Sequence, residues 1–280
     1  MTVAVLGTGT MGAPIAVNVA AAGQDVRAWN RTADKAHGLE GVTACESIAD
    51  AVSGAELVVT ILSDGAAVEA VAGEALPALD DGAVWLQMST VGIAAGERLA
   101  ALAEEHGVPF VDAPVVGTKQ PAEQGKLTVL ASGPKDARER AKPVFDAVSA
   151  GVVELGDAGE GSALKVVVNS WLATLVAGLA ETIALAEAVG IDPKLFLETI
   201  EGGPTGPQYA QLKGAAMIAG EYPTAFALSL TRKDVGLVLE AAESHGFDAP
   251  LARTIAELFD RAIEAGHGDA DMAAVIEAYR

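Results

Sequence analysis

The sequence predicts an α/β fold for the first half of the chain and one long, buried helix in the second half. Three observations support this prediction. Short runs of β-branched and apolar residues alternate with alanine-rich segments between Thr2 and Ser132. The glycine-rich segment GTGTMG directly follows the first of these runs, and an apolar stretch with few interruptions covers 163–189.

The predicted strands are the segments TVAVL, DVRAW, ELVVTIL, AVWLQM, PFVDA and KLTVLAS. Most of these segments are apolar along their whole length, with no regular alternation of polar residues. Strands of this kind belong to a mainly parallel sheet whose two faces are both covered by helices. We therefore expect a doubly wound sheet in the first half of the chain.

The segment GTGTMG carries Gly7, Gly9 and Gly12 in the spacing GxGxxG. The first glycine permits a tight turn, the second lets the backbone approach a pyrophosphate, and the third lets the next helix pack on the strand. Because the motif lies between a strand and a helix, it favours a Rossmann dinucleotide site over a purely structural turn. The expected cofactor contacts of this loop are Gly7, Thr8, Gly9, Thr10, Met11 and Gly12.

The second predicted strand ends in Asn30, Arg31 and Thr32. Folds that prefer NAD usually place an acidic residue here to bind the ribose 2′-hydroxyl. Arg31 instead suits a 2′-phosphate, with Asn30 and Thr32 donating beside it. We therefore predict NADPH as the cofactor; the alternative is that Arg31 is an ordinary solvated cation.

Two polar residues, Lys165 and Asn169, interrupt the apolar stretch 163–189 and share one helical face. In a structural interpretation, Lys165 extends to solvent and Asn169 bonds to a neighbouring helix. Together with Glu181 and Glu187, these residues argue against a membrane-spanning role. A helix that is apolar all round is buried all round, which favours a homodimer.

The composition limits the function further. The chain has 280 residues, 51% of them hydrophobic, and a formal net charge of −20, which disfavours a nucleic-acid partner. The single cysteine, Cys45, is typical of the reducing cytoplasm, and the first residues lack the basic region of a signal peptide. The four histidines show no ligand spacing, so we expect no metal site.

Six segments, in order, resemble the β-hydroxyacid dehydrogenase family. They are GTGTMGAPIAVNVAAAG, ILSD, MSTVG, DAPVVGTKQPAEQGKL, GEGSALKVVVNSW and TRKDVGLVLEAA. Within the family the chain looks most similar to the glyoxylate and succinic semialdehyde reductases, whose relatives include 3-hydroxyisobutyrate dehydrogenases. The resemblance covers essentially the whole chain.

The resemblance implies an NADP-binding Rossmann domain over 1–161 and an all-helical substrate and dimerisation domain over 162–280. It makes Lys165 the catalytic acid and gives Asn169 the role of binding and orienting the substrate. An ammonium group suits this role, because it neutralises the charge that gathers on a carbonyl oxygen during hydride transfer. The further cofactor contacts that the resemblance implies are Leu62, Ser63, Thr90 and Lys233.

One departure from the family pattern concerns the substrate. The loop that holds the substrate carboxylate usually carries a serine where this chain has Val116, so Gly117 and Thr118 are the remaining donors. Val116 therefore favours a less polar carbonyl or an imine over a small α- or β-keto acid as the substrate. Phe226 and Asp234 are further candidate substrate contacts, with plain packing as the alternative.

The leading hypothesis is an NADPH-dependent oxidoreductase that reduces a small aldehyde or keto acid, or oxidises a β-hydroxyacid in reverse. An imine reductase is the second hypothesis. A catalytically silent dinucleotide-binding sensor is the third, and the Lys165–Asn169 pair argues against it.

Overall fold

The structure is a computed structural model that describes all residues, Met1–Arg280. It divides into two compact units, Met1–Lys165 and Val166–Arg280. The long helix α7 (Glu160–Ala188) crosses this division. The domain boundary expected from the sequence, between 161 and 162, falls in the first turn of the same helix.

The first unit contains a six-stranded parallel sheet with the strand order β3-β2-β1-β4-β5-β6. A smaller sheet has the order β7-β8-β9, in which β8 is antiparallel to β7 and parallel to β9. The strands are β1 (Thr2–Leu6), β2 (Asp25–Trp29), β3 (Val42–Ala44), β4 (Leu57–Thr60), β5 (Val84–Gln87), β6 (Phe110–Asp112), β7 (Val115–Val116), β8 (Leu127–Ala131) and β9 (Ser149–Glu154). The predicted doubly wound α/β fold is confirmed.

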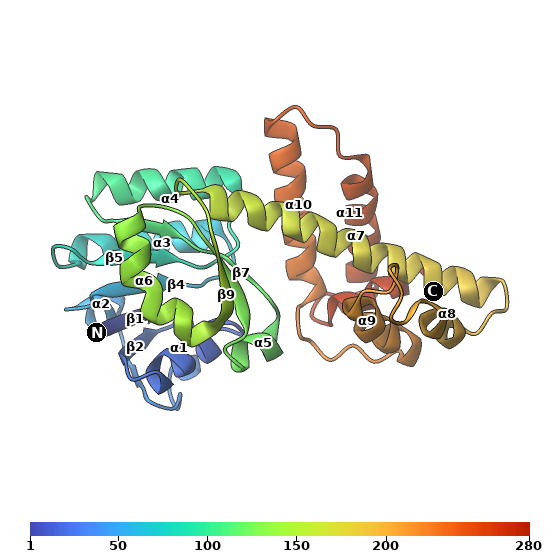
Figure 1. Cartoon of the computed structure of the whole chain (residues 1–280), viewed down its shortest axis with the longest axis horizontal. Helices are drawn as coiled ribbons and strands as arrows, with labels where there is room; N and C mark the ends of the chain where they lie inside the picture. The colour runs from blue at the N-terminus through green and yellow to red at the C-terminus, as the bar shows by residue number, and fades with distance from the viewer. The chain divides into compact units, whose positions relative to one another are not determined.

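Alternate residues of each strand pack on opposite faces of the sheet. In β1, Val3 and Val5 join one apolar cluster, whereas Ala4 and Leu6 join another. The first cluster is covered by α1 and α6, which lie in front of the strands in Figure 1. The helices of this unit are α1 (Gly12–Ala21), α2 (Ile48–Val52), α3 (Gly65–Ala75), α4 (Ile93–Glu105), α5 (Lys119–Glu123) and α6 (Lys135–Val148), with short 3₁₀ helices at Ala33–Lys35 and Leu76–Ala78.

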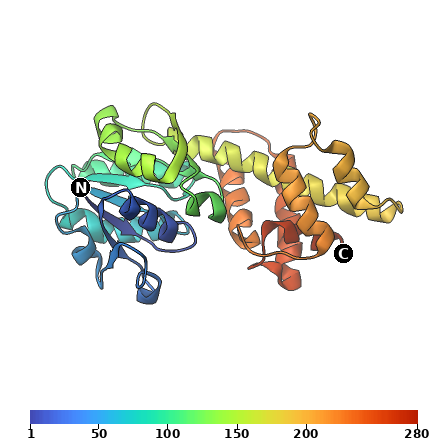
Figure 2. The ribbon, with the colours of Figure 1, turned by 60° about the horizontal axis from the view of Figure 1, so that its bottom comes forward.

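The second unit is helical, as the sequence predicts. Its helices gather around the C-terminal part of α7 (Figure 2), and Val176, Ala180 and Ile183 of α7 are fully buried in the shared core. The helices are α8 (Pro193–Ile200), α9 (Gln208–Ala219), α10 (Leu228–Ser244), α11 (Pro250–Ala262), a π-helical turn at Ile263–His267 and the 3₁₀ helix η4 (Met272–Tyr279). By length and composition α7 is also long and apolar enough to cross a membrane.

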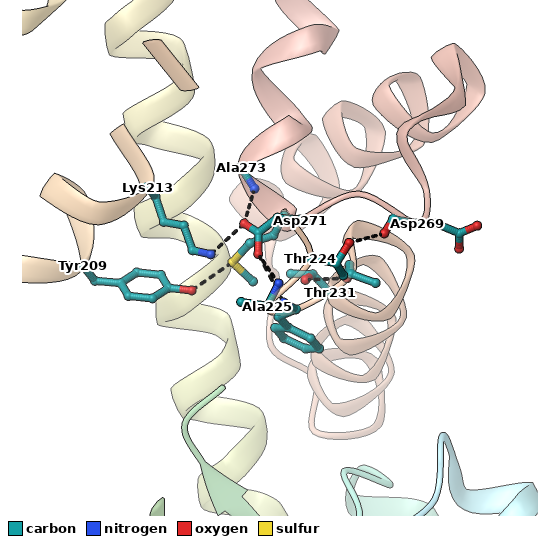
Figure 3. Close-up of polar contacts among 11 residues, drawn as sticks. Tyr209, Lys213, Thr224, Ala225, Thr231, Asp269, Asp271 and Ala273 are labelled. Atoms are coloured by element: carbon teal, nitrogen blue, oxygen red, sulfur yellow. Dashed lines mark hydrogen bonds and ion pairs between the residues drawn. The ribbon is translucent and has the colours of Figure 1, made fainter. Parts of the chain in front are cut away.

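A buried ion pair fastens three segments of the second unit together (Figure 3). Lys213 of α9 donates to Oδ1 of Asp271 at 2.6 Å, and both side chains are at least 95% buried. Oδ1 also accepts from the Ala273 backbone N–H at 3.0 Å, at the start of η4. Oδ2 accepts from the backbone N–H groups of Ala225 and Phe226, at 3.1 and 3.2 Å. Each carboxylate oxygen therefore has two donors, which offsets the cost of burying the charge.

Removing one member of this pair should destabilise the second unit strongly, because it leaves the other charge buried without compensation. We expect Lys213→Ala to lower the free energy of unfolding by about 3–5 kcal/mol. Arg253→Ala removes the exposed Arg253–Asp248 pair of the same unit and should cost at most about 1 kcal/mol. Urea unfolding followed by circular dichroism measures both values. Equal, small losses in the two variants would contradict this account of the pair.

Candidate active site

Several loops meet at the C-terminal edge of the parallel sheet. The strand order reverses between β1 and β4, because the chain moves outward to β2 and β3 on one side and to β5 and β6 on the other. Ligands of open α/β sheets bind beyond the carboxyl ends of the strands at such a point. The GTGTMG loop follows β1 at this position.

The glycine loop is shaped by close backbone contacts. Gly7 has a φ of +110°, and a Cβ atom on Gly12 would lie 2.0 Å from the Gly7 carbonyl oxygen and 2.8 Å from Cγ2 of Ile61. A Cβ on Gly9, in contrast, would have no neighbour within 4 Å. Only the first and third glycines are therefore required by packing, and the backbone at Gly9 stays open to a ligand.

The same loop offers groups that suit a dinucleotide pyrophosphate. α1 begins at Gly12, so its first N–H groups and the positive end of its dipole point toward the loop. The hydroxyl of Thr8 is buried and has no hydrogen-bond partner within the protein. An unsatisfied buried hydroxyl is costly, and a bound phosphate oxygen would satisfy it. The residues present fit the pyrophosphate of a dinucleotide cofactor.

The end of β2 differs in one respect from the sequence-based interpretation. Asn30 accepts from the Thr8 backbone N–H through Oδ1 and donates to the Thr32 carbonyl through Nδ2, both at 3.0 Å. Its amide thus joins the strand end to the glycine loop, in addition to any contact with a cofactor. Arg31 is exposed and takes part in none of the ion pairs, so its guanidinium remains available for an anion.

Ser89, which the sequence analysis did not single out, connects two of the predicted cofactor segments. Its hydroxyl accepts from the Leu62 backbone N–H at 2.8 Å and donates to the Thr60 carbonyl at 3.3 Å. This brings the loop after β4, with Leu62 and Ser63, beside the segment after β5 that continues to Thr90. The sequence signal that could have identified Ser89 is the segment MST, because Ser89 directly precedes the predicted cofactor contact Thr90.

Asp112, at the end of β6, is a second residue that sequence reasoning missed. Its side chain is fully buried and accepts hydrogen bonds from Ser162, Gln87 and Ser132. Burial raises the pKa of the Asp112 carboxyl, and the hydrogen bonds from these residues oppose that rise. Asp112 lies in the DAPVVGT segment, whose Val116 and Gly117 were assigned to the substrate instead.

Lys165 and Asn169 are both largely buried and lie four residues apart on α7, so they share one helical face. Asn169 Nδ2 donates to Asp234 Oδ2 of α10 at 2.7 Å, and Lys233 Nζ lies 3.0 Å from Asp234 Oδ1. A carboxylate only accepts, so this contact fixes the amide orientation. The Asn169 amide nitrogen thus makes the bond to a neighbouring helix that the structural interpretation of the sequence expects. Asn169 Oδ1 has no hydrogen-bond partner within the protein.

The remaining predicted substrate residues lie in two places. Val116 ends β7, Gly117 follows with a φ of +137°, and Thr118 precedes α5. Phe226 is in the second unit, where its ring packs against the helical core and its backbone N–H bonds to Asp271. The side chain of Phe226 therefore has a packing role, whether or not it also meets a substrate.

Two family models match consecutive parts of the chain. The NAD binding domain of 6-phosphogluconate dehydrogenase matches residues 2–156, more than half of the chain. The NAD-binding domain of NADP-dependent 3-hydroxyisobutyrate dehydrogenase matches residues 159–279. The chain belongs to the β-hydroxyacid dehydrogenase family. It is an NAD(P)-dependent oxidoreductase of this type, with a nicotinamide dinucleotide as its cofactor.

Individual proteins match nearly the whole of this chain. The chain is 36% identical to glyoxylate/succinic semialdehyde reductase 2 of Arabidopsis thaliana, over 98% of this chain and 78% of that protein. A 3-hydroxyisobutyrate dehydrogenase from Salmonella typhimurium superposes with a TM-score of 0.90 at 29% identity, covering 99% of both chains. An imine reductase from Pseudomonas sp. shares the fold, with a TM-score of 0.62 at 22% identity, over 100% of this chain and 99% of that one.

Proposed function

We propose that this family member reduces a small aldehyde or keto acid with NADPH and oxidises the corresponding β-hydroxyacid in reverse. The observation that carries the proposal is the place of Lys165. Lys165 is 8% exposed and lies in the first turns of α7, in the same compact unit as the glycine loop. Burying a lysine costs free energy, because its ammonium group loses contact with water. Reduction of a carbonyl requires a proton donor at the reacting atoms, and this role accounts for a lysine at a buried position.

The residues of the chain supply the proton and the orientation. When bound, the reduced nicotinamide supplies a hydride to the carbonyl carbon. The Lys165 ammonium then stabilises the negative charge that develops on the carbonyl oxygen and gives it a proton. Asn169, held by Asp234, presents its amide oxygen as an acceptor. We assign the binding of the nicotinamide end to Thr90 and Lys233.

The preference for NADPH is supported by the residues after β2. Asn30, Arg31 and Thr32 follow β2 in place of the acidic residue that NAD-preferring folds carry there, and Arg31 is exposed. Thr32 is exposed beside it and offers a hydroxyl. One charge-assisted contact to a phosphate is enough to distinguish the two cofactors.

The substrate follows from Val116 and the groups around it. An isopropyl side chain cannot donate a hydrogen bond, so a substrate carboxylate would rely on the backbone of Gly117 and on Thr118. An uncharged aldehyde or an imine loses less from this replacement. Reduction of a C=N bond is therefore the second candidate function, because an imine without a carboxylate does not need the donor that Val116 lacks.

The assembly proposed for this enzyme is a homodimer through α7. Val167, Trp171 and Leu185 are each at least 59% exposed, and their spacing puts them on one face of the helix. An apolar stripe of this length on a helix favours burial against a second copy of the same chain. The cytoplasmic location expected from the single cysteine is part of the same proposal.

The cofactor assignment predicts an asymmetric effect of removing Arg31. Arg31→Ala should raise KM for NADPH by roughly tenfold or more and change KM for NADH little, because only NADPH carries the 2′-phosphate. Arg140→Ala removes an exposed arginine of α6 and serves as the control. Steady-state kinetics with both cofactors decides the matter, and equal use of NADPH and NADH by the unaltered enzyme would refute the assignment.

The role of Lys165 predicts a loss of turnover without a loss of cofactor binding. Lys165→Ala should lower kcat by a factor on the order of a hundred or more, while NADPH still binds as judged by fluorescence titration. Lys135→Ala removes an exposed lysine and should leave kcat unchanged. Near-normal turnover of Lys165→Ala would show that Lys165 is a structural residue. Absence of turnover in the unaltered enzyme, with intact NADPH binding, would favour the silent sensor.

The proposed dimer predicts that a charge on the exposed face of α7 separates the subunits. Leu185→Glu should shift the mass measured by light scattering from that of a dimer toward 28.2 kDa, the mass of one chain. Val153→Glu places the same charge on an exposed apolar residue of β9 and should not change the mass. A compact, active monomer in the unaltered protein would rule out this assembly.

A further inference from the structure

The first turn of α7 is fastened to the sheet by one buried carboxylate. The Ser162 backbone N–H donates to Asp112 Oδ2 at 2.7 Å, and the Ser162 hydroxyl donates to Asp112 Oδ1 at 2.8 Å. The preceding N–H, of Gly161, donates to the Ser132 hydroxyl, which itself donates to the Asp112 carbonyl, both at 3.0 Å. Two of the N–H groups that a helix leaves unpaired at its start are thus satisfied by β6 and the residue after β8.

The same carboxylate is connected to the segment after β5. Gln87 Nε2 donates to Asp112 Oδ1 at 3.3 Å and to the Ser89 carbonyl at 3.0 Å. Ser89 in turn holds the Leu62 backbone N–H. A continuous chain of hydrogen bonds therefore runs from the start of α7 to the two loops assigned to the cofactor.

Lys165 follows Ser162 by three residues, less than one helical turn or about 4.5 Å along the axis. A helix is stiff over that distance, so the position of the Lys165 backbone is set by the contact between Ser162 and Asp112. We propose that Asp112 is a positioning residue of the reaction, which places the Lys165 ammonium relative to the cofactor loops by anchoring the start of α7. This inference rests on the proposed role of Lys165.

A carboxylate suits this anchoring role better than a neutral side chain. It accepts through both oxygens at once, so it holds the N–H and the hydroxyl of one residue and still binds Gln87. Its negative charge also lies at the positive end of the α7 dipole. Asp112 is fully buried and contacts Ser162 and Gln87, so we give it a positioning role and leave the proton transfer to Lys165.

A double-mutant cycle between residues 112 and 165 tests the proposal. Asp112→Asn keeps the shape of the side chain but loses one acceptor and the charge. We expect it to lower kcat by roughly tenfold to a hundredfold, the range for a misplaced catalytic group, with a Kd for NADPH within about threefold of the unaltered enzyme. In the Lys165→Ala background the same change should lower kcat by less than about twofold, because no ammonium remains to be placed.

The outcomes separate this inference from the proposed function. If Lys165→Ala alone keeps turnover, the proposed function fails and the inference fails with it. If Lys165→Ala is inactive to the expected degree but Asp112→Asn has the same effect in both backgrounds, Asp112 acts only on folding or cofactor binding and the inference alone is overturned. Asp146→Asn, which changes an exposed carboxylate of α6 in the same way, is the control and should leave kcat unchanged.

A milder variant keeps the test decisive if Asp112→Asn does not fold. Ser162→Ala removes only the hydroxyl donor to Asp112 and keeps the backbone N–H contact. It should lower kcat by a few fold in the presence of Lys165 and not in its absence. A loss of equal size in both backgrounds would again overturn the inference.

Discussion

The buried contact between Asp112 and the start of α7 is the interaction on which the proposed placement of Lys165 depends. A helix of 29 residues that emerges from a sheet needs a fixed starting point, and here two donors of Ser162 meet the two oxygens of one carboxylate. The cost of burying Asp112 is offset only while these hydrogen bonds persist. The carboxylate therefore selects a single position for the first turn of α7, and with it for Lys165.

The second unit also contains a buried carboxylate that accepts hydrogen bonds from several segments. Asp271 is buried and receives donors from α9, from η4 and from the segment before α10. Its partner is a full positive charge, Lys213, so the pair acts mainly on the packing of the helices. In both units a single carboxylate joins segments that are far apart in the sequence. The apolar core, made mostly of small aliphatic side chains, does not provide that specificity by itself.

The sequence was informative wherever the signal is local. The order of apolar runs predicted the parallel sheet, and the spacing of Gly7, Gly9 and Gly12 placed the loop between β1 and α1. The long-range contacts had no such signal. Asp112 and Ser162 are 50 residues apart, and Asn169 and Asp234 are 65 apart. Neither pair follows from periodicity, because a buried carboxylate in an apolar run looks the same whether it binds a substrate, a metal or the start of a helix.

Asn30 shows a second reason why the sequence does not predict every contact of the site. Its residue type and place predict a phosphate donor, and the structure shows in addition that its amide holds the Thr8 backbone N–H and the Thr32 carbonyl. An amide side chain both donates and accepts, so its type alone does not tell which partner it takes. Val116 illustrates the opposite case: the absence of a donor is visible in the sequence, and its consequence for the substrate depends on groups supplied by the neighbouring backbone.

The central claim is that this enzyme reduces small carbonyl compounds with NADPH through a lysine proton donor. The most direct measurement is the rate of NADPH oxidation by the purified full-length enzyme with glyoxylate, succinic semialdehyde, an aromatic aldehyde and a cyclic imine. The account predicts turnover with at least one of the aldehydes at a rate above that with the imine. Turnover with the cyclic imine alone, or with none of the four compounds while NADPH binds, would contradict it.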